Sequence, residues 1–136
     1  MIVLDTSFLV AFHNERDTHH VAARALMERF LDGEWEEGLL LEYVFLEFVT
    51  VLQARLDHAA AVAAGDTLLR ARELVFVPAS DIFLPTLETF RAEGGGRLSF
   101  ADAAIVTVAR RSAGGQVATF DGGFLAVEGI DVQPPG

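Results

Sequence analysis

The chain has 136 residues, of which 51% are apolar, so it is long enough for a single domain over residues 1–136 with one sizeable core. It contains no cysteine, which excludes disulfides and thiolate metal sites. The formal net charge of −10 argues against an ordinary basic nucleic-acid surface, although bound divalent cations would offset the charge of acids that serve as metal ligands.

The N-terminus and the hydropathy give no sign of export or membrane insertion. Met1-Ile2-Val3-Leu4-Asp5 lacks the basic region of a signal peptide, and no uncharged apolar stretch reaches the ~18 residues that a membrane span needs. We therefore expect a soluble protein of the cytoplasm. All ten basic residues are arginines, whose planar guanidinium suits phosphate, so the composition leaves an RNA partner open without supporting it.

Taken in chain order, the apolar periodicity predicts short strands that alternate with helices. In the first half we expect a strand at 2–4, a helix at 6–13, a helix from a cap at Asp17 or Thr18 to about 31, a strand at 39–41 and a helix at about 43–55. In the second half we expect a helix from a cap at Asp57 to about 72, a strand at 74–77, a helix from a cap at Ser80 to about 93, a helix from a cap at Ser99 to 111, a strand at 116–120 and a short fifth strand at 130–132.

Strands that alternate with helices indicate an α/β fold with a mainly parallel sheet of four to five strands. In open sheets of this kind, binding sites form outside the carboxyl ends of the strands. Asp5 directly follows the first predicted strand, and Asp121 directly follows the fourth. Each is either a site residue or an aspartate that forms a turn or caps a helix, which is common at strand ends.

Two more acids lie on predicted helices with apolar neighbours. Glu47 shares a helical face with Val44 and Val51, in a segment with almost no polar face, so we expect its carboxylate to lie among apolar side chains. Asp102 precedes a run of apolar residues in its helix, but it also lies three residues after Ser99, where the helix dipole favours an acid.

No basic residue is an obvious local partner for these four acids, which suggests that one cation neutralises them together. Mg²⁺ and Mn²⁺ favour oxygen ligands, polarise phosphodiesters and activate water. The pattern therefore predicts a metal site suited to the hydrolysis of a nucleic acid. Thr6 and Ser7 lie beside Asp5 and could orient a ligand or water, or simply begin a helix.

The stretches that contain the four acids are MIVLDTSFLVAF, EYVFLEFVTVL, RLSFADAAIVTVAR and VATFDGGF, in this order. Together they resemble the motifs of the PIN-domain ribonucleases, and more narrowly those of the VapC toxins of prokaryotic toxin–antitoxin pairs. In the second stretch the match falls on Glu47 rather than Glu42. The resemblance covers essentially the whole chain, and it departs from the family pattern at none of the four acids.

This resemblance implies a three-layer α/β/α sandwich whose acidic pocket binds Mg²⁺ or Mn²⁺. It also implies endoribonuclease activity on RNA, inhibition by a cognate antitoxin protein, and a homodimer. Within that expectation, Asp5 and Asp102 are the principal metal ligands, and Glu47 and Asp121 complete the shell directly or through water.

Two other functions compete with this expectation. One is a catalytically inactive PIN fold that serves only as a binding module, although such a module has no physical reason to retain four mutually repelling carboxylates. The other is a phosphate-transferring α/β domain, which usually needs a lysine that this chain lacks. Dinucleotide binding is not expected, because no glycine cluster has the G-x-G-x-x-G spacing after a strand.

Several further residues are open to two interpretations. His19 and His20 lack the spacing of a metal-binding pair, since adjacent residues on a helix point about 100° apart. The arginines that flank the helix of Asp102 either contact RNA or are solvated, and these are Arg97, Arg110 and Arg111. The apolar residues of the early helices belong to the core, an antitoxin groove or a dimer interface.

Overall fold

The computed structural model describes residues 1–135, which form a five-stranded sheet in the order β3-β2-β1-β4-β5, with all four strand pairings parallel. The strands are β1 (Ile2–Leu4), β2 (Gly38–Leu41), β3 (Leu74–Val77), β4 (Gln116–Ala118) and β5 (Asp131–Gln133). The helices are α1 (Thr6–His13), α2 (His20–Leu31), α3 (Glu42–Arg55), α4 (His58–Arg70), α5 (Ala79–Ala92) and α6 (Phe100–Ser112). Two 3₁₀ turns, η1 (Gly94–Gly96) and η2 (Gly122–Phe124), flank α6 and β4.

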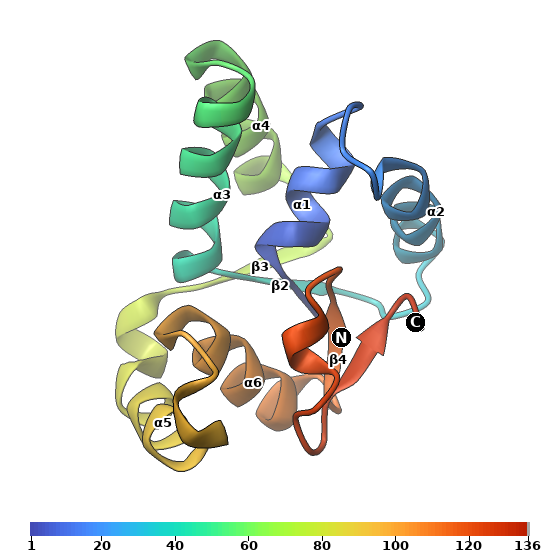
Figure 1. Ribbon diagram of the computed structural model, residues 1–136. Coiled ribbons are helices and arrows are strands. Elements are labelled where there is room, and N and C mark those ends of the chain that lie inside the picture. Colours follow the sequence, from blue (N-terminus) through green and yellow to red (C-terminus); the bar gives the residue numbers. More distant parts are fainter. Residues whose placement is uncertain (136) are drawn as a thin grey trace.

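The helices lie on both sides of the sheet, as Figure 1 shows, with α1 to α4 on one side and α5 and α6 on the other. This arrangement confirms the expected α/β/α sandwich. Each crossover returns the chain to the same edge of the sheet, so the carboxyl ends of all five strands meet there. Because β1 pairs with β4, the residues that follow these two strands are neighbours.

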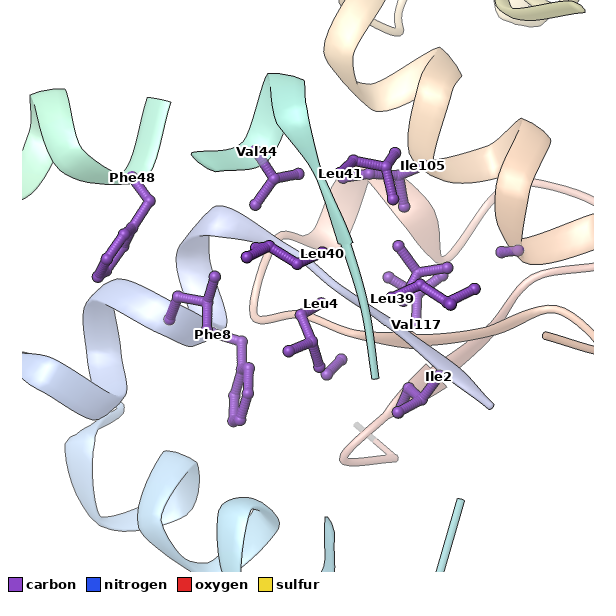
Figure 2. Close-up of a cluster of buried hydrophobic side chains, with 14 of the residues drawn as sticks. Ile2, Leu4, Phe8, Leu39, Leu40, Leu41, Val44, Phe48, Ile105 and Val117 are labelled. Carbon is purple, nitrogen blue, oxygen red and sulfur yellow. The ribbon is translucent and has the colours of Figure 1, made fainter. Parts of the chain in front are cut away.

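The core fills the space between the sheet and both helix layers. In Figure 2, Leu4 and Leu40 lie on the side of the sheet that carries Phe8 of α1 and Phe48 of α3, whereas Leu41 lies beside Ile105 of α6. All six of these side chains are almost completely buried. Consecutive residues of β2 thus pack against different layers, as the period of two in a strand requires.

Several element boundaries differ by one or two residues from the sequence-based expectation, among them β2 and β5, and in two cases a side chain explains the difference. The helix expected to begin at a cap on Asp17 or Thr18 begins at His20, because the Asp17 carboxylate accepts a hydrogen bond from the His19 amide in a preceding turn (2.8 Å). The strand expected to reach residue 120 ends at Ala118, because the amide of Phe120 donates to the Ser7 hydroxyl (2.9 Å). In both places a backbone amide donates to a side-chain oxygen instead of to a backbone carbonyl of the helix or sheet.

The start of α5 was also predicted incorrectly. We expected Ser80 to cap this helix, but the helix already begins at Ala79, and no side chain of its own first turn caps it. The carboxylate of Glu42, the first residue of α3, instead accepts a hydrogen bond from the Ala79 amide (2.9 Å). This cap joins the starts of two helices at the carboxyl edge of the sheet.

Within residues 1–135, no helix combines the length and the apolar character that are needed to cross a membrane.

Candidate active site

Asp5 occupies the centre of the carboxyl edge of the sheet. It directly follows β1, the middle strand, and forms the residue before α1. Its side chain is only 5% exposed. The hydroxyl groups of Ser7 and Thr119 donate to the same carboxylate oxygen, Oδ2, at 2.8 and 2.7 Å. Oδ1 is thus left to other partners, and it is the oxygen through which Asp5 could bind a cation.

The two hydroxyl groups also hold the loop that follows β4. The Ser7 hydroxyl accepts a hydrogen bond from the Phe120 amide at 2.9 Å, and the Thr119 hydroxyl accepts one from the Asp121 amide, also at 2.9 Å. The two hydroxyl oxygens are themselves 3.1 Å apart. This network links the Asp5 carboxylate to the backbone that carries Asp121, so the two acids are positioned by one set of contacts.

Burial raises the pKa of Asp5 above the ordinary value for an aspartate, because the charged form is separated from water. The hydrogen bonds from Thr119, Ser7 and the Thr6 amide act in the opposite direction, and the negative charge of Asp102 raises the pKa further. The donors that reach Asp5 are therefore neutral, and its nearest acidic neighbour opposes its ionisation. A bound cation would favour the charged form.

Asp102 lies in the first turn of α6 and is partly buried. It forms a capping box with Ser99: the Asp102 amide donates to the Ser99 hydroxyl at 3.1 Å, and the Ser99 amide donates to Asp102 Oδ2 at 3.4 Å. Burial raises the pKa of Asp102, the bonds to Ser99 lower it, and the charges of Asp121 and Glu47 raise it. Asp102 therefore caps α6, as the sequence allowed, and also belongs to the acidic cluster.

Asp121 precedes the η2 turn, and its side chain is exposed. Its Oδ1 accepts a hydrogen bond from the Gly123 amide at 2.9 Å, which is the turn-forming arrangement common at strand ends. The second carboxylate oxygen remains for other ligands. Asp121 therefore forms its turn and still contributes negative charge near Asp102.

Glu47 is exposed, which corrects the expectation that its carboxylate lies among apolar side chains. The buried face of α3 is formed by Val44, Phe48 and Leu52, and Glu47 lies outside it. Its neighbour Leu46 is itself 55% exposed, so apolar residues in this helix do not mark its interior. Glu47 lines a hollow with Thr6 and Ser7, which places it beside the carboxyl end of β1.

The four acids thus gather around Asp102, since Asp5 and Asp102 share a charge interaction and Asp102 also responds to Asp121 and Glu47. Their side chains do not converge on one point, however: across the described residues, no three Asp, Glu, His or Cys side chains are arranged to hold a metal ion. The structure shows a cluster of carboxylates with the oxygen chemistry that suits Mg²⁺ or Mn²⁺, but not a closed coordination shell.

The sequence matches the PIN domain family over residues 2–130. The chain belongs to the PIN domain family. It is 30% identical, over 98% of its length and 99% of theirs, to the 23S rRNA-specific endonuclease VapC20 of two strains of Mycobacterium tuberculosis. The fold resembles the crystal structure of M. tuberculosis VapC20, described as a Sarcin-Ricin loop cleaving toxin, with a TM-score of 0.83 and 28% identity over 98% of this chain and 100% of that one.

One residue of this PIN domain site was missed in the sequence. Thr119 is 1% exposed and contacts both Asp5 and the Asp121 backbone, yet it was read only as part of a strand. Its position two residues before Asp121 was the available signal, because a hydroxyl at that spacing can bond the acid's own amide. Thr6 and Ser7 are the expected supporting residues: Ser7 donates its hydroxyl to Asp5, and Thr6 donates its backbone amide.

Other polar residues of the PIN domain have structural partners. The ring nitrogens Nδ1 of His13 and His20 bond the backbone carbonyls of Leu9 and Ala11, both at 2.8 Å. The Arg110 guanidinium binds the Glu93 carboxylate at 2.7 Å and the Glu128 carbonyl. Arg110 thus connects α6 to neighbouring segments, a role that differs from both expected ones, RNA contact and a solvated side chain.

Proposed function

We propose that this PIN domain is a metal-dependent endoribonuclease of the cytoplasm and the toxin of a toxin–antitoxin pair. The observation that carries the proposal is the gathering of four carboxylates around Asp102 at the carboxyl edge of the sheet, with the buried Asp5 among them. The likeness to an endonuclease named for its action on 23S rRNA supports RNA as the substrate, and the VapC name supports an antitoxin partner. A homodimer, expected from the family resemblance, is part of the proposal.

Mg²⁺ or Mn²⁺ is the cofactor that we propose, because the donor set consists of hard oxygen ligands. Asp5 and Asp102 would be the principal ligands, and Glu47 and Asp121 would complete the shell directly or through water. When bound, the ion would polarise the phosphodiester and lower the pKa of water. Ser7 and Thr119 would hold Asp5 Oδ2 and so fix the direction of its other oxygen.

The competing function is an inactive binding module. It is favoured by one observation, namely that the carboxylates of the described residues are not arranged as a closed metal site. The two functions differ in what a metal does to the protein. A module without metal affinity is indifferent to Mn²⁺, whereas the proposed enzyme is stabilised by it, since a ligand that binds only the folded state raises stability.

The decisive experiment compares the wild type with Asp5→Asn and with the control Asp32→Asn. Asp32 is an exposed acid that follows α2, ahead of β2, and therefore lies towards the amino edge of the sheet. With Mn²⁺ we expect the wild type and Asp32→Asn to cleave ribosomal RNA, and Asp5→Asn to lose about 100-fold or more. The melting temperature should rise with millimolar Mn²⁺ in the two active proteins only.

Cleavage that persists in excess EDTA, or that survives Asp5→Asn, would overturn the metal-dependent mechanism. Absence of both cleavage and a Mn²⁺-dependent shift in the wild type would favour the binding module.

A further inference from the structure

We propose that a hollow beside the acidic cluster binds one nucleotide of the RNA that flanks the cleaved bond, with the base stacked on His19 and the phosphate on Arg55. This inference rests on the proposed function and specifies how its substrate is held. The hollow has a volume of about 260 Å³ and is lined by Ser7, Asp17, His19, Glu47, Arg55 and Phe120 among others. It lies between α1, α3 and the loop after β4.

The hollow is continuous with the candidate active site. Ser7, in its wall, donates to Asp5 Oδ2 at 2.8 Å and accepts the Phe120 amide. Phe120 is the residue directly before Asp121, and Glu47 belongs to both the wall and the acidic cluster. A group bound in the hollow is therefore next to the carboxylates, where a nucleotide adjoining the scissile phosphate has to lie.

An aromatic surface forms one side of the hollow. The rings of His19 and Phe120 are stacked, with centroids 4.6 Å apart and planes inclined by only 7°. Phe120 covers one face of the imidazole, and because His19 is exposed, its other face is presented to solvent. Single-stranded RNA is commonly bound by stacking of its unpaired bases on Phe, Tyr, Trp or His rings, which is tolerant of sequence.

Arg55, whose only ion-pair contact among the described residues is a long one, also lines the hollow. Arg55 lies at the end of α3, its side chain is 57% exposed, and its guanidinium is 3.8 Å from the Asp17 carboxylate. By contrast, Arg29 and Arg110 bind carboxylates at 2.7 Å. Arg55 would thus give up little on turning to a phosphate, for which a guanidinium has a two-pronged geometry.

Asp17 holds His19 in place, and its charge also competes with a phosphate for Arg55. Its Oδ1 accepts the His19 amide at 2.8 Å, which holds the imidazole at the mouth of the hollow, and its Oδ2 is the atom nearest Arg55. Because its charge competes with a phosphate, neutralising Asp17 should favour RNA. The volume is below the ~300–1,000 Å³ of small-molecule sites, which suits one unit of an extended strand better than an enclosed ligand.

The test measures binding of a fluorescein-labelled single-stranded RNA of ten nucleotides by fluorescence anisotropy, in EDTA so that the proposed cleavage does not occur. We expect His19→Ala and Arg55→Ala each to weaken binding about 5-fold or more, the range of one base stack or one phosphate contact. His19→Phe should bind like the wild type, and Asp17→Asn should bind more tightly. Arg55→Ala should also lower the slope of log affinity against log salt by about one.

The controls are His58→Ala and Arg24→Ala, which remove exposed residues outside this hollow. With Mn²⁺, His19→Ala and Arg55→Ala should raise KM for RNA and leave kcat nearly unchanged, which a merely structural defect would not do. If the wild type cleaves RNA, and His19→Ala and Arg55→Ala bind and cleave RNA as well as it does, the nucleotide site is overturned and the ribonuclease activity stands. Binding that depends on His19 and Arg55 without any cleavage would overturn the activity and leave the nucleotide site.

Discussion

At the scale of single residues, Asp5 is a buried carboxylate held by two hydroxyl donors. Burial disfavours its charged form, and the neighbouring Asp102 adds repulsion, whereas the two hydroxyl donors offset part of this cost. A hydrogen bond from a neutral hydroxyl stabilises a carboxylate less than a cation does. The site is therefore organised to hold a negative charge in place without neutralising it, which is the electrostatic condition for cation binding.

Thr119→Val should destabilise the folded protein by about 1–3 kcal/mol, because it removes one donor from the buried Asp5 and leaves the partly buried Asp121 amide without its acceptor. Valine keeps the volume of threonine, so packing changes little. Urea unfolding followed by circular dichroism measures the loss. Thr119→Ser retains the hydroxyl and should recover most of it, and equal losses in both variants would point to the methyl group instead.

At the scale of elements, local signals were sufficient where both partners lie within one helical turn. The cap of α4, in which Asp57 accepts the Ala60 amide at 2.7 Å, and the Ser99 cap of α6 were both predicted. The cap of α5 was not, because its acceptor Glu42 lies 37 residues away in the sequence. Only the assembled sheet, in which β2 and β3 are neighbours, brings the two helix starts together.

Glu42→Ala should therefore destabilise the protein by about 0.5–2 kcal/mol, the usual cost of a lost helix cap. Ser80→Ala is the matched control, since Ser80 is exposed and does not cap α5. Its effect should stay within about 0.5 kcal/mol. Thermal and urea unfolding of the two variants measure the difference. The reverse order of stabilities would restore Ser80 as the cap and contradict the contact between Glu42 and Ala79.

At the scale of the whole molecule, topology explains which parts of the site were predictable. Asp5 and Asp121 could be placed together because both follow strands of a parallel sheet, and the β1–β4 pairing confirms it. Glu47 stays a candidate on the family resemblance, whereas the physical argument for it, that its carboxylate lies among apolar side chains, was wrong. The exposure of a helical face depends on how the helix packs, and α3 packs through Val44, Phe48 and Leu52.

The crowding of carboxylates has a consequence for stability as a function of pH. The pKa values of Asp5 and Asp102 are raised above the ordinary 3.8, so the folded state binds protons more tightly than the unfolded chain does. The stabilisation from these protons is fully present below the ordinary pKa and is lost as the pH rises through the raised values. Without metal, this contribution to the free energy of unfolding therefore decreases with rising pH.

Asp5→Asn removes the contribution of Asp5 to this dependence, because the amide stays neutral and its oxygen can still accept the Ser7 and Thr119 hydroxyls. We expect the stability of Asp5→Asn relative to the wild type to increase steadily from pH 4 to pH 7 in EDTA. Urea unfolding at several pH values in that range measures both proteins, so the titration of groups that do not interact with Asp5 cancels in the comparison. A difference that is constant or that shrinks with rising pH would mean that Asp5 is ionised at no cost, and the electrostatic case for a cation at this edge of the sheet would fail.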